Sequence, residues 1–133
     1  MGKLGIPDSP LVRSVLAGAL GLVAYGGWAV FANYDHGIAV ALRSGAVQGS
    51  YSFALTLTMT LLTEWLHGTL SSPRWRAPMT IAVVCALMLS TAYGIHAVAG
   101  TPEIWMTILP GFAIGCVYTT VYVAGLGRER NTA

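Results

Sequence analysis

The sequence predicts an all-α polytopic membrane protein, a bundle of four transmembrane helices with both termini on the cytoplasmic side. Three observations predict it: the composition, the long apolar runs between short polar stretches, and a one-sided distribution of lysine and arginine. Of 133 residues, 55% are hydrophobic and 9% charged, whereas a soluble domain has about a quarter of its residues charged. Each span needs about 20 apolar residues, so four spans predict a single transmembrane domain over residues 1–133.

The first span is predicted over about residues 10–33. It opens with Pro10, which costs no helical hydrogen bond at the first helical position. Its apolar stretch, Val15–Ala32, is longer than the roughly 7–15 residues of a signal-peptide core. We therefore interpret it as a membrane helix, and its small residues, including Gly18 and Gly21, predict a helix-packing face.

The second span is predicted over about residues 47–66. The segment Ile38–Arg43 that precedes it is too short to span and is followed by Gly45. We expect this segment to form a separate interfacial turn of helix that is broken at the glycine. The stretch 68–77 contains serine, proline and two arginines, which predicts a loop before the third span.

The third and fourth spans are predicted over about residues 78–98 and 102–126. The sequence Thr-Pro-Glu at 101–103 predicts a helix start, with a threonine cap, proline at the first position and an acid beside the positive end of the helix dipole. Pro110 deprives the carbonyl of Met106 of its helical donor, which predicts a kinked fourth helix. Such a break either creates an ion or substrate site or is satisfied by neighbouring helices.

The orientation follows from the basic residues. Six of the seven lysines and arginines fall on one side of the four-span arrangement: Lys3, Arg13, Arg74, Arg76, Arg128 and Arg130. Only Arg43 falls on the other side. Because cytoplasmic loops carry the excess of positive charge, both termini are predicted to be cytoplasmic.

A polar stripe on the second span is the most informative feature. A rotation of about 100° per residue places six polar residues on one face, with a seventh, Glu64, at its edge. The six are Gln48, Ser52, Thr56, Thr60, Thr63 and His67. Unpaired polar groups are costly in hydrocarbon, so the stripe must face protein or water. Two interpretations stay open: hydroxyls that bond their own helix in a tight packing seam, or a hydrated path or binding groove.

The fourth span carries a matching face of small and hydroxyl-bearing residues. The same 100° rotation aligns Thr107, Gly111, Gly115, Tyr118 and Tyr122. The spacing Gly111-x-x-x-Gly115 allows another backbone to approach closely. We therefore expect this face to lie beside the polar stripe of the second span.

Ionisable residues near a membrane are candidates for function. Glu64 lies about one turn inside the cytoplasmic end of its span, where it either anchors the helix, with Arg74 or Arg76 as a partner, or couples transport to a proton or cation. On the opposite side, Asp35, His36, His96 and Glu103 come from two connections that can converge. These types of side chain bind divalent metals, but their spacing matches no ligand motif, so no metal and no cofactor are predicted.

Cys85 and Cys116 both fall in the middle of predicted spans. They lack the spacing of a metal or redox motif. We interpret them as packing residues.

The sequence contains no phosphate-binding glycine loop, zinc-protease motif, serine-hydrolase motif or haem-attachment motif, and no basic run for nucleic acid. We therefore predict no enzyme and no nucleic-acid partner. The leading hypothesis is a small permease or channel-like protein of a bacterial inner membrane, in contact with the lipid bilayer, that works as a homo-oligomer and moves a small solute or ion along the hydroxyl-lined stripe. The alternatives are a non-catalytic accessory or scaffold subunit that docks on a larger membrane protein, and a protein that binds lipid-linked substrates.

Overall fold

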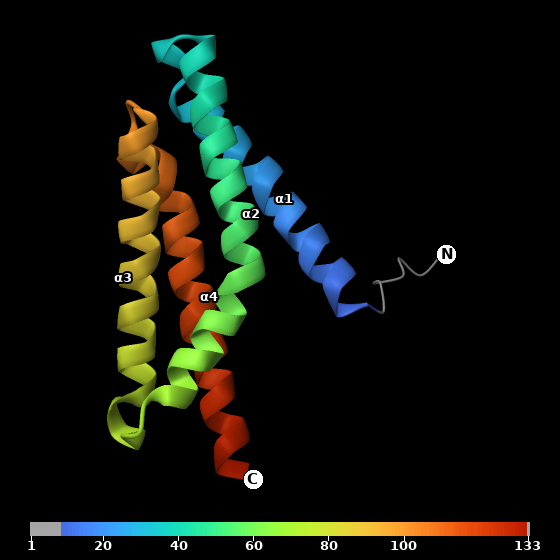
Figure 1. Ribbon diagram of the computed structural model, residues 1–133, viewed down its shortest axis with the longest axis vertical. Helices are drawn as coiled ribbons and strands as arrows, with labels where there is room; N and C mark the ends of the chain where they lie inside the picture. Colours follow the sequence, from blue (N-terminus) through green and yellow to red (C-terminus); the bar gives the residue numbers. More distant parts are fainter. Residues whose placement is uncertain (1–8, 133) are drawn as a thin grey trace.

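The computed structural model describes residues 9–132, without the side chains of residue 10 and residues 129–132. Within this range the chain forms four α-helices and one 3₁₀ turn (Figure 1). They are α1 (Pro10–Ala32), η1 (Tyr34–His36), α2 (Ile38–Thr69), α3 (Pro73–Ala99) and α4 (Ile104–Thr132). Three of the helices, α1, α3 and α4, are long and apolar enough to cross a membrane. The prediction of an all-helical membrane protein is confirmed to that extent.

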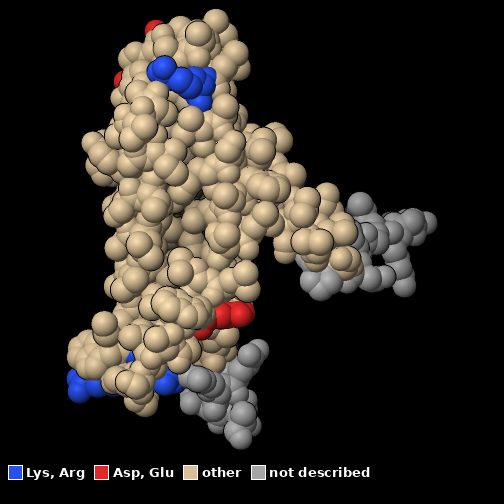
Figure 2. All heavy atoms as spheres, viewed as in Figure 1, with Lys and Arg blue, Asp and Glu red and all other residues tan. Residues whose placement is uncertain are grey.

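The two ends of the bundle differ in shape. At one end, residues 33–37 connect α1 to α2 and residues 100–103 connect α3 to α4. We call this the closed end. At the other end, residues 70–72 connect α2 to α3, and α1 diverges from the other three helices toward its N-terminus (Figure 1). We call this the open end. Lysine, arginine and acidic side chains gather toward the two ends, with an uncharged band between them (Figure 2).

Helix α2 corrects the prediction of a separate turn broken at Gly45. It runs without interruption through 32 residues and begins directly after Gly37. Gly37 has a φ of 96°, a conformation that glycine adopts without steric cost. Gly45 does not break the helix because the backbone hydrogen bonds of α2 continue through it; its missing side chain instead makes room for α1.

Glycines of α1 and α2 allow these two helices to approach each other closely. A Cβ atom on Gly45 would lie 2.5 Å from Cγ2 of Val30 and 2.9 Å from the carbonyl oxygen of Gly26. A Cβ on Gly49 would lie 2.9 Å from the carbonyl oxygen of Leu22. Real side chains do not tolerate such distances to backbone atoms. The spacing Gly45-x-x-x-Gly49 therefore serves helix packing, a role that is not predicted above for either glycine.

The four glycines predicted to serve packing differ in how tightly they are surrounded. A Cβ on Gly18 would lie 2.9 Å from the ring of Phe53 in α2, and one on Gly115 would lie 2.9 Å from the sulfur of Met88 in α3. The first of these allows α1 to approach α2, and the second allows α4 to approach α3. Contacts of 3.4 Å or more surround the other two positions, Gly21 and Gly111.

A small apolar core joins α2, α3 and α4 at mid-length. Met59, Val84 and Met88 are buried there, and both cysteines pack against them. Both thiols are free. The interpretation of Cys85 and Cys116 as residues in the packed interior therefore agrees with their position.

The start of α4 differs from the predicted threonine cap. Thr101 is buried, and its hydroxyl contacts the Nδ1 atom of His96 at 2.8 Å. The helix begins three residues later at Ile104. Tertiary contact with α3 thus takes the hydroxyl that the sequence pattern assigns to a cap. Pro110 lies inside α4, and the predicted kink there stays a prediction.

Candidate functional site

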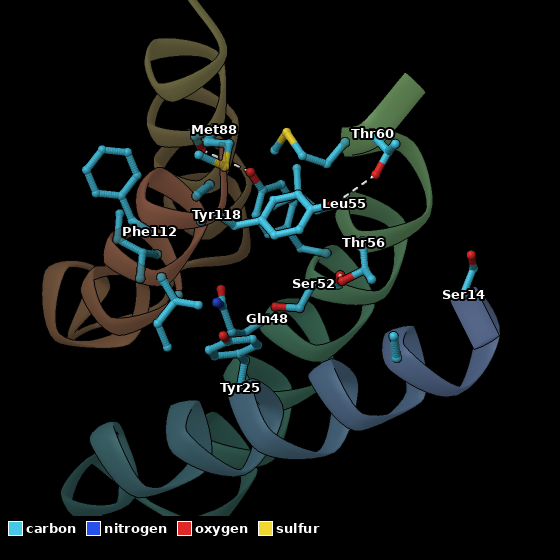
Figure 3. Close-up of a pocket in the computed structure, with 18 of the residues that line it drawn as sticks. Ser14, Tyr25, Gln48, Ser52, Leu55, Thr56, Thr60, Met88, Phe112 and Tyr118 are labelled. Carbon is cyan, nitrogen blue, oxygen red and sulfur yellow. Dashed lines mark hydrogen bonds between the residues drawn. The ribbon is translucent and has the colours of Figure 1, made fainter. Parts of the chain in front are cut away.

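A cleft of about 410 Å³ lies among the four helices. Figure 3 shows it bordered by α1, α2 and α4, with Met88 of α3 reaching its wall. Its volume falls within the range of small-molecule sites, roughly 300–1,000 Å³. Its polar lining comes chiefly from six residues on α1, α2 and α4: Tyr25, Gln48, Ser52, Thr56, Thr60 and Tyr118.

The polar stripe of α2 divides between the cleft and the packed interior. Gln48, Ser52, Thr56 and Thr60 line the cleft. Further toward the open end the stripe turns away from it. The remaining three members, Thr63, His67 and Glu64, do not line the cleft; the first two are buried and the last is exposed.

The face predicted on α4 meets the stripe across the cleft. Tyr118 points from α4 toward α2 (Figure 3), and its hydroxyl lies 3.1 Å from Oγ1 of Thr60. Gly111 and Gly115 of the same face also line the cleft. The two helices singled out from the sequence therefore form opposite walls of one site.

The threonine hydroxyls keep bonding capacity for a ligand. Thr56 donates to the carbonyl of Ser52 at 2.8 Å, the back-bonding expected of hydroxyls in a helix. A hydroxyl that donates its proton still offers lone pairs as acceptors. Thr56 is also exposed rather than covered by a neighbour. The packing and the groove interpretations therefore apply to different parts of the same stripe.

A buried hydrogen-bond chain ends the cleft toward the closed end. Oε1 of Gln48 lies 2.7 Å from Nε2 of His96, and Nδ1 of that ring lies 2.8 Å from the Thr101 hydroxyl. The amide oxygen can only accept, so the imidazole donates through Nε2 and accepts the hydroxyl proton at Nδ1. A neutral ring with one proton satisfies both contacts.

Asn33 joins α1 to α4 at the closed end. Its side chain is fully buried. Nδ2 donates to the carbonyl of Ala29 at 2.9 Å and to Oγ1 of Thr107 at 2.8 Å, and Oδ1 accepts from the backbone N–H of Glu103 at 3.0 Å. That N–H precedes the first turn of α4, where donors lack helical partners. One asparagine therefore satisfies a helix start and links two helices.

The proline of α4 takes part in the same junction. Pro110 removes the helical donor for the carbonyl of Met106, and the indole Nε1 of Trp28 donates to that oxygen at 2.8 Å. A neighbouring helix thus supplies the missing donor. This contact matches the interpretation in which neighbouring helices satisfy the carbonyl that the proline leaves free. Arg43 adds a further link, since Nη2 donates to the carbonyl of Gly100 at 3.0 Å.

The four ionisable residues predicted to converge at this end do not form one group. Nε2 of His36 lies 3.1 Å from Oε1 of Glu103 in an exposed pair. His96 is buried in the chain with Gln48, and Asp35 is exposed on η1. Within residues 9–132, no group of three or more histidine, cysteine, aspartate and glutamate side chains is placed to hold a metal ion.

Charged residues near the open end have other partners. Glu64 accepts a short hydrogen bond from the Tyr122 hydroxyl. The guanidinium of Arg74 lies 5.5 Å from the centre of the Trp75 ring, and Nε of Arg76 donates to the carbonyl of Leu70 at 2.7 Å. Arg13 lies at the edge of the cleft on α1.

Several important residues were missed from the sequence. The sequence pattern identifies Asn33 only as the end of a span and gives no role to Trp28. Tyr51 donates to the carbonyl of Met88 at 3.0 Å and lines the cleft, but it lies off the predicted stripe. The carbonyl freed by Pro110 was a usable signal, because it demands a donor from another helix.

Comparison with known proteins found no family model, no curated protein and no solved structure that matches this chain.

Proposed function

We propose that this chain is a four-span permease of the inner membrane, which binds a small solute in the cleft between α1, α2 and α4 and works as a homo-oligomer. The observation that carries the proposal is the difference between the two ends. Four interhelical links close one end, made by Trp28, Asn33, Arg43 and His96. At the other end α1 diverges from the other helices (Figure 1), and the hydroxyl-lined cleft lies between α1, α2 and α4 (Figure 3).

The crossing of α2 is supported by the helices on either side of it. Helix α1 ends at the closed end and α3 begins at the open end. If α1 and α3 both span the membrane, α2 must cross it too. Its 32 residues extend roughly 48 Å at 1.5 Å per residue, which is enough to cross. Its polar face is compatible with lipid because other helices cover much of it.

The orientation is supported by the arginines. Arg13, Arg74, Arg76 and Arg128 belong to the helix ends at the open end, and Arg43 to the closed end. The sequence contains two more basic residues, Lys3 and Arg130. Lys3 and the side chain of Arg130 lie outside the part of the chain that the structure describes. The positive-inside rule then directs the open end toward the cytoplasm, so the cleft would receive its solute from that side.

The lining indicates the class of solute. The described residues that line the cleft include no carboxylate, and Arg13 is the only charged one. Hydroxyl and amide groups alternate with apolar side chains such as Leu55 and Phe112. This combination favours a neutral or anionic solute with an apolar part over a hydrated cation, since few polar groups in a mostly apolar site are typical of small-molecule binding.

Flux into liposomes tests the proposal. The double variant Thr56→Val/Thr60→Val keeps side-chain volume and removes two lining hydroxyls. We expect about tenfold lower flux of the transported solute, which corresponds to roughly 1.4 kcal/mol of lost hydrogen bonding. The matched control is Thr58→Val/Thr120→Val, because both of these hydroxyls are exposed, bond their own helix and lie outside the cleft.

The flux measurement is repeated over a series of solutes, with neutral and anionic solutes first and inorganic cations second. Flux in the wild type that the control variant retains and the cleft variant loses supports the proposal. Absence of flux for every solute, together with a strictly monomeric mass in nanodiscs, contradicts it. A stable larger membrane protein that co-purifies after mild solubilisation would instead favour the accessory-subunit alternative.

A further inference from the structure

The mid-bundle core contains four sulfur atoms contributed by three helices. Met59 of α2 and Met88 of α3 are buried, and Cys85 and Cys116 pack against them from α3 and α4. The two thiols are free, and both cysteines pack against the same cluster of buried residues. From these residues we propose that Cys85, Cys116 and Met88, with Met59 beside them, form a binding site for a monovalent copper ion, Cu(I).

Coordination chemistry selects the ion. Thiolate and thioether ligands favour soft ions such as Cu(I). Structural zinc is usually held by four cysteine or histidine ligands, and calcium and magnesium require oxygen ligands. No third histidine, cysteine or carboxylate joins the two thiols within the described residues. The set therefore suits a low-coordinate sulfur site and does not suit the harder ions.

Helix packing brings the sulfurs together. The Met88 sulfur lies so close to the α4 backbone that a Cβ on Gly115 would be 2.9 Å from it. Gly115 directly precedes Cys116, and Met88 lies one helical turn from Cys85. The missing side chain at Gly115 thus lets the Met88 thioether pack against the α4 backbone beside Cys116, while both cysteines pack against the cluster that contains Met88. Packing alone explains each sulfur-bearing residue separately, because methionine and cysteine are good core residues, but it does not require four of them to gather in one cluster.

An entry path leads to the cluster. Met59 and Met88 both line the cleft, and Figure 3 shows the Met88 side chain at its wall. An ion that enters from the open end reaches the thioethers first and the thiols behind them. Binding would displace two protons: Cu⁺ and two thiols give a bis-thiolate complex of charge −1 and two H⁺. The copper stays in the +1 state, so no oxidant or reductant takes part.

The test is a Cu(I) titration of the purified full chain in detergent, without oxygen, against the chromophoric chelator bicinchoninate. We expect one Cu(I) per chain, and X-ray absorption at the copper edge should show sulfur neighbours only. Cys85→Ser or Cys116→Ser should weaken binding by about 100-fold or more, since changes at residues around a metal ligand already cost roughly 10–100-fold. Met88→Leu should weaken it by about tenfold.

The matched control is Met79→Leu, because Met79 is exposed on α3 and lies outside the cleft and the core cluster. It should bind Cu(I) as the wild type does. Equal binding by the wild type and the double variant Cys85→Ser/Cys116→Ser overturns the proposal, as does oxygen or nitrogen coordination in the absorption spectrum.

A second measurement uses only the wild-type protein, so it does not depend on whether the variants fold. Cu(I) added to the wild type should protect both cysteines from a thiol-alkylating reagent, as detected by mass spectrometry of the intact chain. Full alkylation in the presence of bound copper contradicts the proposal. Neither measurement uses solute flux, so the copper site and the proposed permease function are tested independently.

Discussion

The closed and open ends of the bundle differ in how completely their polar side chains are hydrogen-bonded. Both contain polar side chains that lie between the helices. At the closed end, Asn33 and His96 are fully buried, and each of their polar atoms has a partner on the protein. At the open end, Thr56 is exposed and Thr60 half-buried beside a cleft. Paired polar groups fix helices in place, whereas partly paired ones leave capacity for a ligand.

The comparison predicts that substitutions at the closed end act on stability and those along the cleft act on binding. The largest effect is expected at the α1–α2 contact. Gly45→Leu would insert a side chain where even a Cβ comes within 2.9 Å of the Gly26 carbonyl oxygen. Overpacking against backbone typically costs 1–3 kcal/mol, so we expect a loss of about 3 kcal/mol in the free energy of unfolding.

Reversible unfolding in mixed detergent micelles measures this loss. The matched control is Gly27→Leu, because a Cβ at that position meets nothing within 4 Å. The control should stay within about 0.5 kcal/mol of the wild type, as expected for a surface position. Similar losses in the two variants would show that Gly45 has no special role in holding α1 against α2.

A smaller loss is expected when the asparagine junction is removed. Asn33→Leu deletes the bonds to Thr107 and to the N–H of Glu103. Interhelical hydrogen bonds in membranes average about 0.6 kcal/mol, and an unsatisfied buried donor adds a penalty of about 1–3 kcal/mol. We therefore expect about 2 kcal/mol of destabilisation in the same unfolding measurement.

Spin labels make this prediction specific to the closed end. Labels on Phe31 and Trp105, both exposed there, should show a broader distance distribution in the Asn33→Leu protein. Labels on Val12 and Val121, both exposed toward the open end, should change little. The background for labelling replaces Cys85 and Cys116 by serine. Broadening confined to the open-end pair would contradict the role assigned to Asn33.

The smallest effect on stability is expected inside the cleft. Thr60→Val removes the hydroxyl that contacts Tyr118 at 3.1 Å. Both residues are partly accessible, so the free energy of unfolding should change by no more than about 0.5 kcal/mol. Tyr118→Phe removes the other half of the pair and serves as the matched comparison. Destabilisation by 2 kcal/mol or more in either variant would mean that the contact is structural and would weaken the case for a binding cleft.

The sequence by itself determined the helical membrane class and the polar stripe. A chain with few charges and long apolar runs cannot cover its surface with polar groups, so it folds in a membrane. The rotation per residue of a helix fixes which residues share a face. For these reasons the stripe from Gln48 to Thr60 and the facing glycines and tyrosine of α4 could be predicted as parts of one region. The carbonyl freed by Pro110 could be predicted as well.

Only the tertiary structure decided which partner each of these groups has. Whether Gly45 breaks α2 or packs against Gly26 depends on the presence of α1, because local sequence permits both. The partners of His96 and Asn33 come from residues 48 and 74 positions away in the chain, respectively. Periodicity gives the direction of a side chain on its own helix but not the distance to another helix. The divergence of α1 and the cleft are both properties of the arrangement of several helices (Figures 1 and 3), so no property of a single helix could reveal them.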